Sequence, residues 1–123
     1  LQIQLLLLKN INYDFTMSIK VAIEDIGKRL EEYGNSAYVV TMTKEGKAKI
    51  VHSIITLEED FIICSPGKGT IKNLTHSSSV SFLFPPNSHG GFSMIIDGIC
   101  QVQDQEKDSI KVAVTDGVLH RPA

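Results

Sequence analysis

Short runs of β-branched and aromatic residues, each followed by a turn signal, dominate the chain after Gly34. Val, Ile, Thr, Tyr and Phe favour strands, whereas clusters of Gly, Pro and Asp mark turns. Gly98, inside the fifth run, predicts a bulge or bend, and Asp116 with Gly117 predicts a tight turn. Runs of turn-linked strands with few helices favour an antiparallel barrel or sandwich. The predicted strands cover residues 37–43, 48–56, 60–64, 79–84, 92–103 and 110–114.

Two helices are expected beside these strands. Ser18 is a favourable N-cap residue, and apolar residues recur at helical spacing from Ile19 to Leu30. Gly34 then provides a C-terminal stop, so the first helix has about four turns. Thr70 could cap a second, shorter helix over residues 70–76. The predicted order is one helix, three strands, a short helix and three more strands.

The length of 123 residues suits one domain. We expect residues 17–123 to form it and residues 1–16 to be an extension from an alternative start codon or an expression vector. The alternative is that residues 1–16 form an extra strand or arm on the barrel. The apolar run over residues 5–8 is too short for a secretory signal or a membrane span, so no membrane partner is expected.

The charge and cysteine content exclude several classes of function. With 12 basic and 14 acidic side chains, the chain is too balanced to predict a nucleic-acid partner. Cys64 and Cys100 lie in apolar runs and form no CxxC pair, so we expect reduced cysteines and a cytoplasmic protein. The four scattered histidines lack the spacing of metal ligands, and no metal site is predicted.

The segment from Cys64 to Phe84 carries the clearest chemical signal. A buried strand leads into the glycine-rich sequence SPGKGT, followed by the short helix and another strand. Backbone N–H groups at the start of a helix favour phosphate, and Lys68 and Thr70 add a charge and a hydroxyl. The spacing differs from that of a Walker loop. The pattern therefore indicates either a phosphate site or an exposed turn that happens to contain lysine.

The order of these pieces resembles the pyridoxamine 5'-phosphate oxidase-like family of FMN-binding split barrels. The resemblance covers residues 18–103 and is carried by the segments SAYVVTMTKEGKAKIVHSIIT, DFIICSPGKGT, IKNL, SSVSFLF and MIIDGICQVQ. It implies a mainly β fold, an antiparallel six-stranded split barrel with flanking helices.

The resemblance also implies a homodimer that binds FMN at the subunit interface. The second strand would run along the flavin and its ribityl chain, and the end of the third strand with its loop would hold the ribityl and phosphate groups. Thr70 stands where family members often have a second basic residue, and Arg121 would reach the flavin of the partner subunit. The implied cofactor-binding residues are Lys49, Ile50, Val51, His52, Ser53, Cys64, Ser65, Lys68, Thr70 and Arg121.

The activity that the resemblance implies is that of a flavin-dependent oxidoreductase acting on a small-molecule substrate or electron donor. No general acid or base is identifiable. The chain has no Trp, and its ending, LHR, only faintly matches the substrate segment of true pyridoxamine phosphate oxidases, so oxidation of vitamin B6 is not expected. The alternatives are a non-catalytic binding module for flavin, haem or a related cofactor, and a deazaflavin-dependent reductase.

Overall fold

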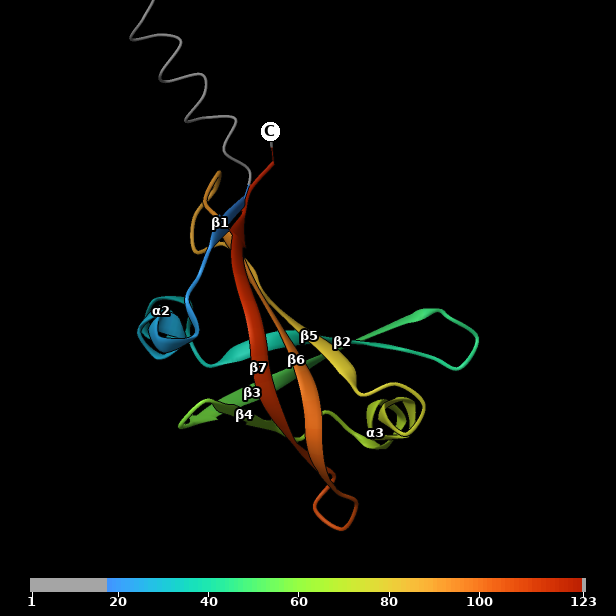
Figure 1. Cartoon of the computed structure of the whole chain (residues 1–123). Coiled ribbons are helices and arrows are strands. Elements are labelled where there is room, and N and C mark those ends of the chain that lie inside the picture. The colour runs from blue at the N-terminus through green and yellow to red at the C-terminus, as the bar shows by residue number, and fades with distance from the viewer. Residues whose placement is uncertain (1–17, 123) are drawn as a thin grey trace, which may run out of the picture.

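The computed structural model describes residues 18–122, so the predicted extension over residues 1–16 lies outside the described part (Figure 1). In this part, no helix has the length and apolar character that crossing a bilayer requires. The elements, in chain order, are β1 (Ser18–Lys20), the 3-10 helix η1 (Ile23–Asp25), α2 (Ile26–Tyr33), β2 (Ser36–Met42), β3 (Ala48–Glu58), β4 (Phe61–Cys64), α3 (Lys68–Leu74), β5 (Ser79–Phe84), β6 (Ser93–Asp104) and β7 (Ser109–His120).

Six of the strands close into an antiparallel barrel. The strand order is β1-β7-β4-β3-β2-β5-β6, and a further pairing of β6 with β7 closes the ring. The long strand β7 pairs with β6 on one edge, while its other edge pairs first with β4 and then, near His120, with β1. The predicted six-stranded antiparallel barrel with flanking helices is therefore confirmed, and β1 is an additional short strand outside the ring.

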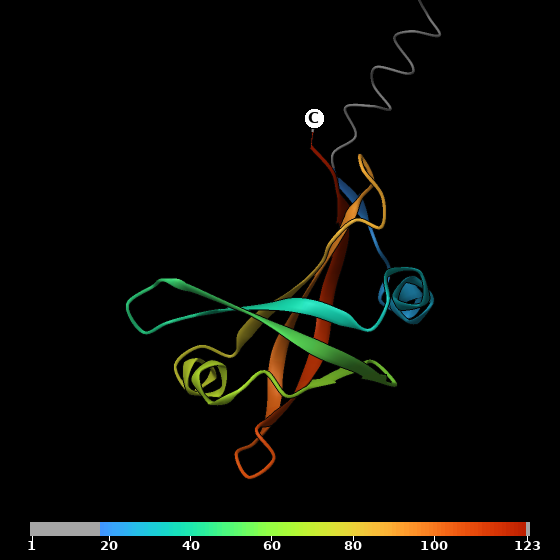
Figure 2. The same cartoon turned by 180° about the vertical axis from the view of Figure 1, so that it is seen from behind.

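The core fills the barrel interior through the alternation of each strand. In β5, for example, Val80, Phe82 and Phe84 are buried, whereas the residues between them face outward and are more exposed. The two helices lie on opposite sides of the barrel, as two opposite views show (Figures 1 and 2). Ile26 of α2 and Ile71 of α3 belong to the same buried cluster, so both helices are fixed by core packing.

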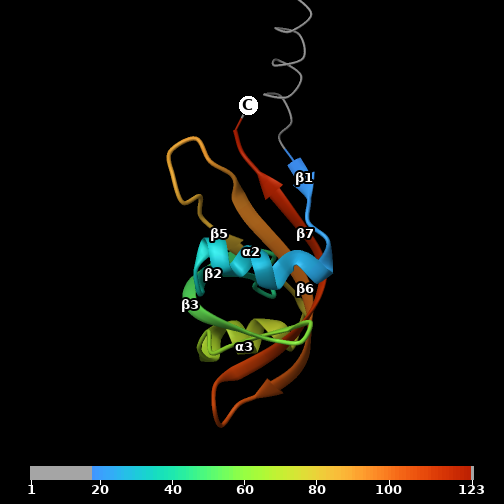
Figure 3. The same cartoon turned by 90° about the vertical axis from the view of Figure 1, so that its left-hand side faces the viewer.

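The predicted start of the first helix was wrong. Ser18–Lys20 form strand β1 instead, paired with the end of β7, and the helical conformation begins only at Ile23 (Figure 3). The backbone N–H of Val21 continues this contact by donating to the carbonyl oxygen of Gly117, at 2.8 Å. Pairing with β7 therefore overrides the local helical pattern. The predicted helix end is confirmed, because Gly34 closes α2 with a φ of 88°.

The prediction for the C-terminal strand was too short. Asp116 and Gly117 form no turn, and β7 runs through them to His120. Gly117 is needed for close packing, because an added Cβ would lie 3.3 Å from the Cβ and the carbonyl oxygen of Val21. The bulge predicted at Gly98 is confirmed by a register shift between Asp97 and Gly98.

Candidate functional site

Strands β3 and β4 separate part-way along their length. They pair only from Ile55 to Glu58 of β3, whereas residues 48–54 of β3 pair with β2 on the other edge. Beyond Cys64 the chain leaves the sheet and leads to α3. We call this divergence the β3–β4 fork. Within the described residues, the fork leaves one edge of β3 without a strand neighbour, so backbone polar groups on that edge are available to a ligand.

An open groove lies at the fork. It has a volume of about 470 Å³ and lies beside Ser65, the residue that follows β4. On the β3 side of the groove, His52 is exposed. Its Nε2 lies 3.2 Å from Ser36 Oγ, and the centre of its ring lies 4.9 Å from the centre of the Tyr38 ring. Four predicted site residues are thus brought together, because the groove is lined by His52, Ser53, Ile54, Thr56, Ile63, Cys64 and Ser65.

Two of these lining residues turn toward the barrel interior. Cys64 is 4% exposed and Ser53 is 8% exposed. Burial raises the pKa of the Cys64 thiol to about 12, partly opposed by a hydrogen bond from Ser53. The thiol therefore stays protonated near neutral pH, so Cys64 contributes packing and not a thiolate nucleophile.

Lysines gather around α3, next to the groove. The ammonium of Lys49 lies against Gly69, where an added Cβ would collide with it, so the glycine allows this close approach. Lys68, at the start of α3, is exposed and lines a hollow between this helix and the β6–β7 turn, together with Lys72 and Asp108. Lys49 and Lys68 thus place positive charge where the chain leaves the groove.

The helix that carries Lys68 and Lys72 begins earlier than predicted. Its N-cap residue is Gly67, so the expected cap by Thr70 was wrong. Thr70 is fully buried, and its Oγ1 has no hydrogen-bond partner among the described residues. The Thr70 hydroxyl therefore faces the protein interior, whereas Lys68 of the same helix is exposed.

The outer face of β2 and β3 is unusually apolar. Ile50 is 59% exposed and Ile54 is 61% exposed, and Tyr38 and Met42 on β2 are also exposed. We call these four residues the β2–β3 outer face. Val51 belongs to the opposite side of the strand and packs against the core. The register places the exposed His52 between the two isoleucines and opposite Tyr38, and exposed groups of large apolar side chains such as these are typical of interaction surfaces.

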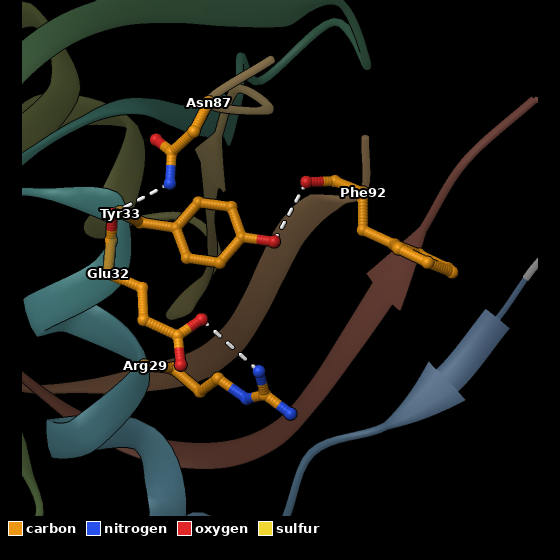
Figure 4. Close-up of polar contacts among 5 residues, drawn as sticks. All are labelled: Arg29, Glu32, Tyr33, Asn87 and Phe92. Atoms are coloured by element: carbon orange, nitrogen blue, oxygen red, sulfur yellow. Dashed lines mark hydrogen bonds and ion pairs between the residues drawn. The ribbon is translucent and has the colours of Figure 1, made fainter. Parts of the chain in front are cut away.

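Arg121 directly follows the end of β7 and is not among the residues that line the groove. Its guanidinium lies 4.8 Å from the centre of the Phe92 ring. The carbonyl oxygen of Phe92 accepts a 2.8 Å hydrogen bond from the Tyr33 hydroxyl at the end of α2, and Asn87 donates to the carbonyl oxygen of Glu32 (Figure 4). The loop between β5 and β6 is therefore attached to α2, and within one protomer Arg121 does not join the other predicted site residues.

Sequence reasoning missed two features of the site. Gly69 was treated as part of a generic glycine loop, although its packing role depends on Lys49, which is distant in sequence. The sequence alone gives Lys72 no clear direction, although it follows Lys68 by one helical turn and lines two hollows beside α3. Only that helical spacing could have indicated Lys72 from the sequence. The described residues contain no group of three or more side chains placed to hold a metal ion.

Solved structures share this architecture at low sequence identity. The FAD-binding protein of Mesorhizobium loti superposes with a TM-score of 0.60 at 12% identity, covering 86% of this chain and 98% of that protein. The FAD-binding protein of Mycobacterium smegmatis superposes with a TM-score of 0.59 at 16% identity, covering 85% of this chain and 99% of that protein. A candidate pyridoxamine 5'-phosphate oxidase from Corynebacterium glutamicum also gives 0.59, at 10% identity, covering 87% and 96%. This chain has the split-barrel fold. The resemblance found in the sequence is thus confirmed at the level of the fold.

The same split barrel occurs in proteins with other cofactors. An F420 reductase and the haem storage protein of Vibrio cholerae match with TM-scores of 0.55 and 0.56, at 8% and 11% identity. The first covers 78% of this split barrel and 93% of its own chain, and the second 82% and 96%. The shared fold alone therefore does not specify a cofactor.

Sequence comparison adds two uncharacterized mycobacterial proteins, from Mycobacterium bovis and Mycobacterium tuberculosis. Each is 38% identical to the split barrel over 61 residues, which is 46% of this chain and 43% of the relative. The match thus spans less than half the length of these relatives. No family model matches the chain.

Proposed function

We propose that this split barrel is a flavin-binding homodimer of the pyridoxamine 5'-phosphate oxidase-like family and acts as a flavin-dependent oxidoreductase. The observation that carries the proposal is the β3–β4 fork, where an open groove, an unpaired strand edge and a lysine-bearing helix meet. The FAD-binding proteins that share the fold support a flavin as the ligand. Since both cysteines are free, the cytoplasm remains the proposed location.

The groove offers the two kinds of contact that a flavin ring needs, namely apolar packing and backbone hydrogen bonds. A planar aromatic ring system can lie against the apolar side chains of Ile54 and Ile63, and the free edge of β3 offers backbone groups to its polar side. Bound flavin would accept hydride or electrons from a reduced donor. Backbone N–H groups of β3 would stabilise negative charge on the reduced ring.

The lysines beside α3 fit the phosphate of FMN. Lys68 follows the end of the groove by three residues, and the ammonium of Lys49 lies at the neighbouring Gly69. Hydrogen bonds between an ammonium and a phosphate are among the strong polar contacts in proteins. We assign the phosphate to Lys68 and Lys49. The buried Thr70 hydroxyl is left out of this assignment.

The β2–β3 outer face fits a second copy of the chain. Its isoleucines lie on the same strand as the groove, so a partner covering this face would also cover the flavin. Burying two exposed isoleucines per protomer favours association, at about 1.5–3 kcal/mol for each fully buried side chain. Arg121 of the partner subunit would then approach the cofactor, whereas Arg121 of the same subunit does not line the groove.

A titration of the purified protein with FMN tests the proposal. We expect absorbance bands at about 370 and 450 nm, standard for oxidised flavin, and a stoichiometry of one flavin per protomer. Lys68→Ala should weaken FMN binding by about 1.5–3 kcal/mol, the cost of losing a charged hydrogen bond. Lys28→Ala, on the exposed face of α2, is the matched control and should bind normally. Unchanged affinity in Lys68→Ala would remove this lysine from the site.

Haem storage is the second candidate, because His52 lines the groove and one protein of this fold stores haem. Imidazole is a common axial ligand of haem iron. In this case haem titration would give a Soret band that His52→Ala abolishes, and FMN would not bind. A non-catalytic flavin module would instead bind FMN but show no turnover with any reduced donor.

A further inference from the structure

A second basic hollow lies beside the position assigned to the phosphate. It has a volume of about 310 Å³ and is formed between the β2–β3 turn and α3. Lys44, Lys49, Lys72 and His76 line it, and Glu45 is the carboxylate among its lining residues. Lys72 also lines the hollow that contains Lys68, so the positive charge continues around α3.

Positive charge outweighs negative charge in this hollow, because three lysines line it against the one carboxylate of Glu45. Within residues 18–122, Arg29 and Glu32 on α2 form an ion pair. In the same part of the chain, none of the three lysines of the hollow forms an ion pair with a carboxylate. The whole chain has a net charge of -2, so this concentration of lysines runs against its overall balance. Like charges held close together repel, and a bound anion would relieve that repulsion.

Both walls of the hollow are fixed by hydrogen bonds. In the β2–β3 turn, Thr43 N donates to Lys47 O at 2.7 Å, and Gly46 N donates to Thr43 O at 2.9 Å. On the other wall, Asn73 Nδ2 of α3 donates to the buried Thr41 Oγ1 at 3.2 Å. The lysines therefore extend from a preorganised frame, which lowers the entropic cost of ordering them around a ligand.

We propose that this hollow binds a second anionic group of the cofactor, beyond the ribityl phosphate. This inference rests on the proposed flavin site. Lys49 connects the two subsites, because its ammonium lies at Gly69, next to Lys68, and its side chain lines the second hollow. The preferred ligand is thus a flavin or deazaflavin whose tail is longer and more negative than that of FMN. The diphosphate of FAD and the carboxylates of the F420 tail both supply this chemistry.

Riboflavin 5'-diphosphate is the sharpest probe, because it differs from FMN by one phosphoryl group. Titrations followed by flavin fluorescence should show that the wild-type protein binds the diphosphate at least about tenfold more tightly than FMN. In Lys44→Gln/His76→Gln, whose two residues line only the second hollow, that preference should fall below about threefold while FMN affinity changes by less than about twofold. Lys28→Gln on α2 is the control and should keep the wild-type preference.

The outcomes separate this inference from the proposed function. Equal wild-type affinities for FMN and the diphosphate, or a preference that survives in the double variant, would overturn the second subsite and leave the flavin site standing. Titrations with FAD and with F420 distinguish the two sources of the second anion, and the favoured ligand should lose its advantage in the double variant. Failure of all four ligands to bind would overturn both proposals.

Discussion

Replacing Gly69 with alanine should weaken cofactor binding without destabilising the folded protein. The added Cβ would occupy the space of the Lys49 ammonium, at the far end of a flexible side chain that can move away. Gly69 lies within α3 and its φ is not in the left-handed region, so alanine suits its backbone. We therefore expect the variant to fold normally, with Lys49 displaced from its place beside Gly69.

The two expected effects have opposite signs. Alanine in place of glycine within a helix stabilises the folded state by about 0.5–1 kcal/mol. Loss of a charged hydrogen bond weakens binding by about 1.5–3 kcal/mol, but the displaced lysine stays close enough to keep part of its attraction. A loss of about 1.4 kcal/mol, or tenfold in the dissociation constant for FMN, is the expected result.

Urea denaturation and FMN titration measure these two effects on the same preparation. Lys49→Gln should reduce FMN affinity by a similar factor, and combining it with Gly69→Ala should add almost nothing, because both changes remove the same contact. A folded Gly69→Ala protein with wild-type affinity would refute the role of Lys49. Independent, additive losses in the double variant would show that Gly69 acts in another way.

Three further predictions concern the barrel and its surface. Gly98→Ala should lower the free energy of unfolding in urea by about 1–3 kcal/mol, because its Cβ would lie 2.7 Å from the backbone oxygen of Ala113; an unchanged midpoint would contradict this. Ile54→Glu should produce a folded monomer in size-exclusion chromatography with light scattering, since it puts a charge into the proposed interface; a persistent dimer would exclude the β2–β3 outer face. Folding raises the pKa of Cys64 from 9.0 to about 12, so the stability that this thiol contributes is complete below pH 9 and is lost as the pH rises toward 12; Cys64→Ala should show a weaker decline over that range, and identical declines would contradict the assignment.

The strands were predictable because their pattern is local. The runs of β-branched and aromatic residues at β5 and β6 are strands as predicted, and Gly98 marked the bulge correctly. The ends of the barrel were not predictable in this way. Strand β1 (Ser18–Lys20) pairs with the last residues of β7, although the two segments lie near opposite ends of the sequence. Neither segment contains a local pattern that predicts the other as its partner.

The candidate site was predictable in its parts but not in its arrangement. His52, Ser53, Cys64 and Ser65, which the resemblance assigned to the cofactor, line one groove, and their contact with a cofactor stays a prediction. The burial of Thr70 and the approach of Lys49 to Gly69 depend on how α3 packs against β2 and β3, and packing of that kind has no local sequence signal.

Amide hydrogen exchange with and without FMN tests the central claim most directly, because the fork leaves one edge of β3 open. We expect FMN to slow exchange in peptides covering residues 50–56 and 64–69, with little change in α2. Protection confined to other parts of the barrel, with exchange along β3 unaltered, would contradict the assignment of the flavin to the β3–β4 fork.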